Sequence, residues 1–347
     1  MRELAITAAN AITAVGHDGA MTAASVRAGI SRMVEYGAYL DQEDNPITAT
    51  PIRGLEDGLD TPTRMARVAA LCLKDLLAGY FQGEHPRPAQ LQLFLGVASE
   101  QRPGPRYEEG CIHPLREMMA EWAENAEVQT IAQGNASLQY AIAEAGRLIE
   151  SNPGALCIVA GVDSLLRDST LNWFEQDSRL KSTSYGRHHG LIAGEAVGFL
   201  VVEDLERAKQ ANRPILACIA GLGVAEEPMP RAGNAISRNT GLTQACQTAL
   251  AVVPGNDVCA VFADLNGENP RAKEWGMAEM RSLSNRAEPR QLWTPANCYG
   301  DIGAASGALL ATVATQGFIR GWLRGGPVLV TCSDDHGPCG ALVLYKG

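Results

Sequence analysis

The sequence predicts an α/β fold, and two observations lead to this prediction. Short apolar runs alternate along the chain with longer segments of helical periodicity, which is typical of α/β proteins. The order helix, buried strand, turn, buried strand also occurs twice, once in each half of the chain. Hydrophobic residues make up 46% of the 347 residues and charged residues 20%, so the chain can build a large core.

The expected elements follow from these patterns. The predicted strands are short apolar runs at 91–97, 156–162, 196–202, 214–219, 258–263, 327–331 and 341–345. The predicted helices have apolar residues every three or four positions and lie at 22–28, 63–77, 114–125, 136–151, 240–252 and 304–324. We expect less regular structure at 40–60, 82–88 and 101–110, and a loop rich in Pro and Gly at 228–238.

The repeated unit divides the chain into two halves. In the first half, a helix of small residues follows Gly134 and ends before a Pro-Gly turn at 152–154, and two buried strands come next. In the second half, a similar helix follows Gly303 and stops at 325–327, again before two buried strands. Gly and Pro end helices in this way because neither continues the helical hydrogen bonding well. We therefore expect two similar halves, 1–207 and 208–347, within one compact unit.

Charge and cysteine usage exclude several classes of protein. Lys and Arg number 29 and Asp and Glu 39, a net charge of −10, and no run of basic residues is present, so nucleic-acid binding is not expected. The N-terminal segment lacks the apolar stretch of a secretory signal, and no window approaches ~18 uninterrupted apolar residues, so no membrane contact is expected. The nine cysteines are scattered and form no C-x-x-C pair. These features predict a cytoplasmic protein with reduced thiols, without a metal site or a cofactor.

Several segments carry a resemblance to a known family. They are 12–16 (ITAVG) with 25–31 (SVRAGIS), 135–145 (NASLQYAIAEA), 155–166 (ALCIVAGVDSLL), 190–209 (GLIAGEAVGFLVVEDLERAK), 299–307 (YGDIGAASG) and 337–344 (GPCGALVL). Their order and spacing resemble the thiolase superfamily, and within it the β-ketoacyl (3-oxoacyl-ACP) synthases. The resemblance implies a five-layer αβαβα fold made of two similar halves. It also implies dimerisation through a strand near 128–133, either as a homodimer or with another thiolase-fold subunit.

The resemblance also locates the positions that are catalytic in that family. A Cys begins the central helix there, because backbone N–H groups and the helix dipole lower its pKa and bind an oxyanion. Two His residues complete that site. In this chain the Cys position falls on Asn135, the first His on Asn266 or the adjacent Leu265, and the second His on Asp301.

These replacements remove the family's chemistry. The amide of Asn135 is a poor nucleophile, because its nitrogen lone pair is delocalised. The carboxylate of Asp301 repels an enolate. The family's apolar gating loop corresponds to 334–337 (DDHG), which is charged and contains Asp335 and His336. We therefore expect no catalytic residue of the family type, and a remnant pocket formed by Asn135, Asn266, Asp301, Asp335 and His336.

Other groups are candidate substitutes for the lost nucleophile. Cys339 with His336 is the best candidate dyad, and Cys298 and Ser137 are the alternatives. Buried structural cysteines are commoner than reactive ones, and a Ser at a helix start usually bonds the local backbone. Asp301, Asp335 and His336 are also compatible with a polar network or a carboxylate–imidazole metal site.

Three functions remain open. The first is a catalytically silent protein that binds another protein, as an accessory, chaperone-type or non-catalytic subunit. The second is an acyltransferase acting on acyl thioesters with a relocated nucleophile. The third is binding of a small ligand in the remnant pocket without turnover, although Asp301 and Asp335 disfavour a fatty chain there.

Overall fold

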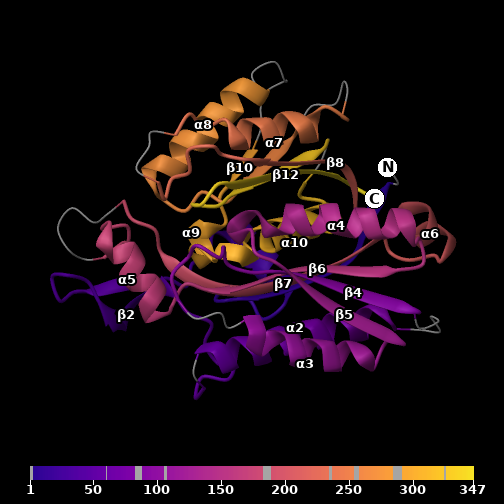
Figure 1. Ribbon diagram of the computed structural model, residues 1–347, viewed down its shortest axis with the longest axis horizontal. Coiled ribbons are helices and arrows are strands. Elements are labelled where there is room, and N and C mark those ends of the chain that lie inside the picture. The colour runs from indigo at the N-terminus through magenta and orange to yellow at the C-terminus, as the bar shows by residue number, and fades with distance from the viewer. Residues whose placement is uncertain are drawn as a thin grey trace.

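The chain folds into five layers, in which two β-sheets alternate with three layers of helices (Figure 1). The computed structural model describes residues 3–59, 61–82, 88–104, 108–182, 189–233, 237–253, 258–283, 291–323 and 326–347. Helices α2 (Thr61–Tyr80) and α3 (Glu108–Ala120) form one outer layer, and α7 (Gly241–Leu250) and α8 (Asn269–Leu283) form the other. Helices α4 (Ser137–Ser151) and α10 (Ser306–Ile319) lie between the sheets. The predicted five-layer architecture is confirmed.

The two sheets have the same connectivity. The first has the order β5 (Asn125–Ile131), β4 (Gln90–Gly96), β6 (Leu156–Ser164), β7 (Ala193–Asp204), β1 (Leu4–Thr13). The second has the order β10 (Gln291–Trp293), β9 (Ala260–Ala263), β11 (Val328–Ser333), β12 (Pro338–Tyr345), β8 (Ala217–Glu226). In each, the first three strands are mutually parallel and the last two pair antiparallel. The halves are therefore similar, and they join where β1 pairs with β8. The predicted boundary after residue 207 falls within α6 (Leu205–Gln210) and stays a prediction.

Smaller elements complete the molecule. Helix α1 (Gly19–Ala28) packs beside α10. Strands β2 (Val34–Leu40) and β3 (Pro46–Thr50) form a hairpin, and the end of β3 pairs in parallel with the first residues of β7. The short helices are α5 (Asp168–Gln176), α6 and α9 (Ala296–Tyr299). Two 3₁₀ turns, η1 (Gly134–Ala136) and η2 (Gly303–Ala305), lead directly into the central helices α4 and α10.

Most of the apolar core lies in three layers. One layer lies between the two sheets, and each of the other two lies between the outer face of a sheet and the helices that cover it. Helix α10 is buried on nearly all sides because it lies between the sheets, so it has no polar face. Small residues let it approach α4 closely: a Cβ added at Gly307 would lie 2.6 Å from the Cβ of Leu138. This close packing explains the run of small residues in both central helices.

All the predicted strands and helices are present, but several ends differ. The predicted helix at 114–125 begins earlier, at Glu108, and ends at Ala120. Its start was missed because the apolar spacing of Cys111, Leu115 and Met119, which are all fully buried, begins before Pro114. The segment 40–60, expected to be irregular, contains β3. The predicted helix at 304–324 ends at Ile319, just before Gly321 adopts a φ of 69°.

Strand β8 was predicted at 214–219 but runs from Ala217 to Glu226. Gly221 and Gly223 interrupt the apolar pattern, and this hid the second part of the strand. Helix α7 lies directly on these glycines. A Cβ at either position would lie only 2.0 Å from a carbonyl oxygen of α7. The glycines therefore serve helix–strand packing.

The remaining sequence predictions concern the state of the thiols, the absence of a membrane span and the cellular location. All nine cysteines are free, and eight of them are buried. Within the described residues, no helix has both the length and the apolar character needed to cross a membrane. The cytoplasmic location stays a prediction.

An aspartate from each half lies at the start of the other half's central helix. Gly134 and Gly303, which begin η1 and η2, both have a φ of 51°. Asp334, after β11, accepts a hydrogen bond from the backbone N–H of Asn135 at 3.3 Å, and Asp163, in β6, accepts one from Ala304 at 2.8 Å. A Cβ on Gly134 would lie 1.7 Å from Asp334 Oδ2, and a Cβ on Gly303 would lie 2.1 Å from Asp163 Oδ2. Glycine is required at both positions by the φ angle and by these carboxylates.

Replacement of Asp163 tests the importance of this arrangement. Arg102 forms a bidentate ion pair with Asp163, with distances of 2.8 and 2.6 Å. We expect Asp163→Ala to lower the free energy of unfolding by about 3–5 kcal/mol, because it removes the carboxylate facing a buried guanidinium. The measurement is urea denaturation. As a control, Glu144→Ala, which breaks a largely exposed ion pair with Arg147, should cost less than about 1 kcal/mol. Equal losses would contradict this interpretation.

Candidate functional site

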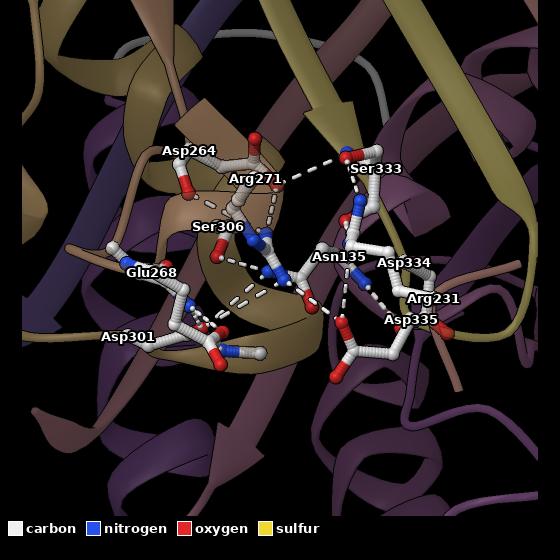
Figure 2. A network of polar contacts seen from close by, with 12 residues as sticks. Asn135, Arg231, Asp264, Glu268, Arg271, Asp301, Ser306, Ser333, Asp334 and Asp335 are labelled. Atoms are coloured by element: carbon white, nitrogen blue, oxygen red, sulfur yellow. Dashed lines mark hydrogen bonds and ion pairs between the residues drawn. The ribbon is translucent and has the colours of Figure 1, made fainter. Parts of the chain in front are cut away.

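The residues predicted to occupy the catalytic positions lie together where η1 and η2 meet (Figure 2). Asn266 donates to Asp301 Oδ2 through Nδ2 at 2.7 Å. Asn135 donates through Nδ2 to Asp301 Oδ1 at 3.5 Å and to Ser306 Oγ at 3.3 Å. All three predicted side chains are buried. The positions inferred from the resemblance therefore form one site.

Asp301 is held as a hydrogen-bond acceptor. Its Oδ1 also accepts from the backbone N–H of Gly303 at 2.9 Å, while its own N–H donates to the carbonyl of Ile192 at 2.7 Å. Both carboxylate oxygens therefore have donors, and the residue anchors the start of η2. The carboxylate offers no hydrogen bond to an oxyanion, which is what the family's His supplies at this position.

Arg271, from α8, lies beside these residues and was not predicted from the sequence. Its Nη1 is 2.6 Å from Asp264 Oδ2, and its Nη2 is 3.6 Å from Asp335 Oδ1 and 3.9 Å from Asp301 Oδ2. Its side chain is only 3% exposed. Burial lowers the pKa of Arg271, but the carboxylates of Asp264, Asp301 and Asp335 outweigh this and hold the pKa well above its ordinary value.

Two more arginines, from the loops after α5 and β8, bind Asp335 of the predicted gating loop. Arg179 Nη2 is 2.7 Å from Asp335 Oδ2, and Arg231 Nε is 3.1 Å from Asp335 Oδ1. Arg179 also forms a bidentate pair with Glu268, at 2.7 and 2.9 Å, and Arg231 pairs with Glu274. Burial raises the pKa of Asp335, but the three arginines, Arg179 first, overcome it and hold the pKa well below its ordinary value.

These contacts form a closed network, in which five carboxylates surround three guanidinium groups. The carboxylates are those of Asp264, Glu268, Glu274, Asp301 and Asp335. Burial raises the pKa of Asp264 to about 6, although Arg271 lowers it. Because carboxylates outnumber guanidinium groups, the network repels a developing enolate or oxyanion.

Asp334 accepts a hydrogen bond from the backbone N–H at the position where the family's site binds an oxyanion. The backbone N–H of Asn135, at the start of the helical segment, donates to Asp334 Oδ2. The other oxygen, Asp334 Oδ1, accepts from the backbone of His336 at 2.9 Å and lies 3.1 Å from His336 Nδ1. His336 also stacks on Trp173, with 5.5 Å between ring centroids. The loop predicted to correspond to the gate is thus bound to the site on both sides.

The predicted substitute nucleophiles lie in protected surroundings. Cys339 is fully buried, its thiol donates to the carbonyl of Gly337, and burial raises its pKa well above the ordinary value. No hydrogen bond joins Cys339 to His336, although both are described. Burial also raises the pKa of Cys298. The hydroxyl of Ser137 is fully buried and lies between backbone groups, 2.9 Å from the carbonyl of Ile131. None of these groups has the exposure and lowered pKa typical of a reactive nucleophile.

A small cavity adjoins Asp301 on the side of η2. A cavity of about 10 Å³ lies between Asp264, Tyr299, Asp301 and Ser306. The hydroxyl of Tyr299 is buried without a hydrogen-bond partner. A cavity of this size holds about one water molecule, which would satisfy such a hydroxyl. It is too small for an acyl chain.

The metal alternative considered from the sequence has no matching cluster. Asp301 and Asp335 are linked by Arg271, and His336 faces Asp334 instead. In the described part of the chain, no group of three or more His, Cys, Asp or Glu residues is arranged to hold a metal ion.

Comparisons with known proteins show the fold. No family model matches the sequence, and a search of curated proteins gives no match. Among solved structures, the whole chain aligns with 99% of the ishigamide ketosynthase/chain length factor, at 19% identity and a TM-score of 0.78. It aligns with the whole of a β-ketoacyl synthase from Burkholderia phymatum STM815, at 18% identity and a TM-score of 0.75. It also aligns with 99% of a ketosynthase chain solved with a type II PKS acyl-carrier protein, at 14% identity and a TM-score of 0.78. The chain therefore has a β-ketoacyl synthase-like fold.

The raised pKa of Asp264 predicts an unusual dependence of stability on pH. The native protein binds the Asp264 proton near pH 6, whereas the unfolded chain binds it near pH ~4. The contribution of Asp264 to the free energy of unfolding should therefore fall as the pH rises from about 4 to about 6, by up to about 1.4 kcal/mol per pH unit, and should change little above pH ~7. Denaturation of the wild type and of Asp264→Asn at several pH values measures it. The variant should lack this slope, and equal slopes would contradict the prediction.

The carboxylate of Asp334 should suppress a thiol placed at position 135. We expect Asn135→Cys to react slowly with iodoacetamide, because Asp334 occupies the local N–H and disfavours a nearby thiolate. Adding Asp334→Asn removes the charge and should raise the alkylation rate about tenfold, equivalent to one pKa unit. Mass spectrometry measures the rate at this site, and Asp334→Asn alone controls for the nine native cysteines. An unchanged rate would show that Asp334 does not control this position.

Proposed function

We propose that this protein is a catalytically silent member of the β-ketoacyl synthase-like fold and that it acts by binding another protein. The observation that carries the proposal is the closed ion-pair network at the site, together with the carboxylate of Asp334 on the N–H of Asn135. A site that condenses acyl groups needs an open pocket, a nucleophile and donors for an oxyanion. Here arginines and carboxylates fill that place.

The preserved scaffold supports a role as a partner. Function lives in the residues grafted on a fold, so a fold can keep its surfaces after its chemistry is lost. Two of the similar structures are assemblies, a ketosynthase/chain length factor and a ketosynthase in complex with an acyl-carrier protein. An accessory, chaperone-type or non-catalytic subunit is the corresponding role for this chain.

Strand β5 is the proposed surface for a thiolase-fold partner, either a second copy or a different subunit. Among the described strands it pairs only with β4, so its other edge offers unpaired backbone groups. Its exposed side chains alternate with half-buried ones along most of its length. This strand covers most of the segment 128–133 at which the resemblance implies dimerisation. Light scattering on the purified protein measures the resulting oligomer.

The alternative functions have less support. An acyltransferase using Cys339, Cys298 or Ser137 would need a buried group to become exposed and activated. Ligand binding in the remnant pocket would have to compete with the contacts that its polar side chains already make with one another and with Arg179. Both alternatives become outcomes of the following test.

We expect no covalent acyl adduct when the purified protein is incubated with malonyl- and acyl-thioesters and its intact mass is recorded. The buried thiols and the closed network prevent attack on the thioester. Protein unfolded in denaturant is the positive control for thiol acylation. A stoichiometric adduct on the folded protein that is lost in Cys339→Ser or Cys298→Ser would overturn the proposal and identify the nucleophile. Steady turnover without an adduct would overturn it equally.

A further inference from the structure

A groove lies on the molecule away from the site described above. It has a volume of about 610 Å³ and runs between α1 and the C-terminal end of α10. Its lining residues are Ala20, Ala23, Ala24, Arg27, Gln316, Arg320, Gly321 and Trp322. Helix α10 starts at the network and has 14 residues, so the groove lies roughly 20 Å from it.

Small side chains on α1 create the groove. Ala20, Ala23 and Ala24 share one face of the helix with Arg27, since positions three or four residues apart are neighbours. Methyl groups fill little of the space beside α10, so a shallow apolar floor remains. Ala24, Arg27 and Arg320 are exposed, whereas Ala20 is half-buried and Ala23 is buried, so the floor is open to solvent mainly at Ala24. Small-molecule sites enclose most of their ligand, so an open floor of this kind favours a macromolecule.

The groove is positively charged on an acidic protein. Among the described residues, no carboxylate forms an ion pair with Arg27 or Arg320, and α1 and α10 contain no acidic residue. Both arginines lie at helix C-termini, where each helix dipole contributes about half a negative charge. Two guanidinium charges exceed that contribution, so the groove keeps a net positive potential on a chain of net charge −10.

Aromatic packing holds one of these charges in place. The guanidinium of Arg27 lies 5.4 Å from the ring centroid of Trp322. Trp322 packs on Trp293 at 4.9 Å between centroids, and Trp293 stacks on Phe262 of the core. A guanidinium stacked on a ring keeps its N–H edge free for a carboxylate. Less side-chain entropy is lost when such a preorganised group binds.

Large apolar side chains are exposed on the same two helices. Met21 on α1 is 52% exposed and Ile319 on α10 is 49% exposed. They add exposed apolar surface to these helices, although neither side chain lines the groove. The alanine methyl groups and the two guanidinium groups of the groove match an amphipathic helix with carboxylates along the edge of its apolar face.

We propose that the groove between α1 and α10 binds an acidic amphipathic helix of a protein partner. Leu or Met side chains of that helix pack on Ala20, Ala23 and Ala24, and its Asp or Glu side chains pair with Arg27 and Arg320. The proposal rests on the protein-binding function above and adds a surface and a partner chemistry distinct from strand β5.

The test uses the full chain and two labelled helical peptides of about 18 residues. One has a Leu face bordered by Glu, and the other is identical except that Lys replaces every Glu. Fluorescence anisotropy measures binding, and shifts of the Trp322 indole signal in NMR spectra locate it. We expect the Glu peptide to bind about tenfold tighter than the Lys peptide, and more tightly at low salt.

Variants connect the binding to the groove. The double variant Arg27→Glu, Arg320→Glu should weaken the Glu peptide at least about tenfold and reverse the preference. Ala24→Leu keeps the charge but fills the floor, and it should weaken binding as well. Arg116→Glu, a matched charge reversal at an exposed position on α3, should leave binding within about twofold. Circular dichroism verifies that each variant is folded.

Several results would overturn the proposal. They are equal binding of both peptides, absence of binding, or binding unaffected by the double variant. Displacement of the peptide by pyrophosphate, with no effect of Ala24→Leu, would identify a simple anion site instead. Each of these outcomes leaves the acyl-thioester result unchanged, so the docking surface can fail while the catalytically silent function stands. An acyl adduct, conversely, would overturn the proposed function whatever the peptides do.

Discussion

The structure depends on carboxylates that each half of the molecule contributes to the other. Asp163 lies at the start of η2 and Asp334 at the start of η1, and each accepts a backbone N–H there. Unpaired N–H groups and the positive end of the helix dipole make such a position favourable for an anion. In an acyl-condensing site this is where a reacting group binds. Here side chains of the protein itself occupy it, so one interaction both joins the halves and closes the site.

The buried network around Asp301 and Asp335 is costly to assemble, because three arginines and five carboxylates lose most of their water. Such networks are weak evidence for stability, but removing one member leaves the others uncompensated. Arg179, Arg231 and Arg271 come from a loop after α5, a loop after β8 and helix α8. By converging on Asp335 they position these segments over the central helices. The network therefore acts as a structural centre where related folds place their chemistry.

The sequence predicts much of the fold but only part of the site. Apolar periodicity locates the buried strands and the central helices, because those patterns are local. The positions of Asn135, Asn266 and Asp301 follow from the resemblance to the β-ketoacyl synthases, and the structure places them in contact. Arg179 and Arg231 were missed because their partners are distant in sequence: Arg179 and Asp335 are 156 residues apart, and Arg231 and Asp335 are 104 apart. Paired acidic residues at strand ends were the only local sign that cations lie nearby.

Helix α10 has a consequence for how the protein folds. It is apolar on all sides and contacts both sheets, so no single half can cover it. A chain with only one folded half would expose this apolar helix to water. The exposed surface would favour association with other chains, because association buries it. Insertion of α10 between the sheets thus couples the two halves into one cooperative unit. The architecture consists of two similar halves, but the two halves fold together as a single cooperative unit.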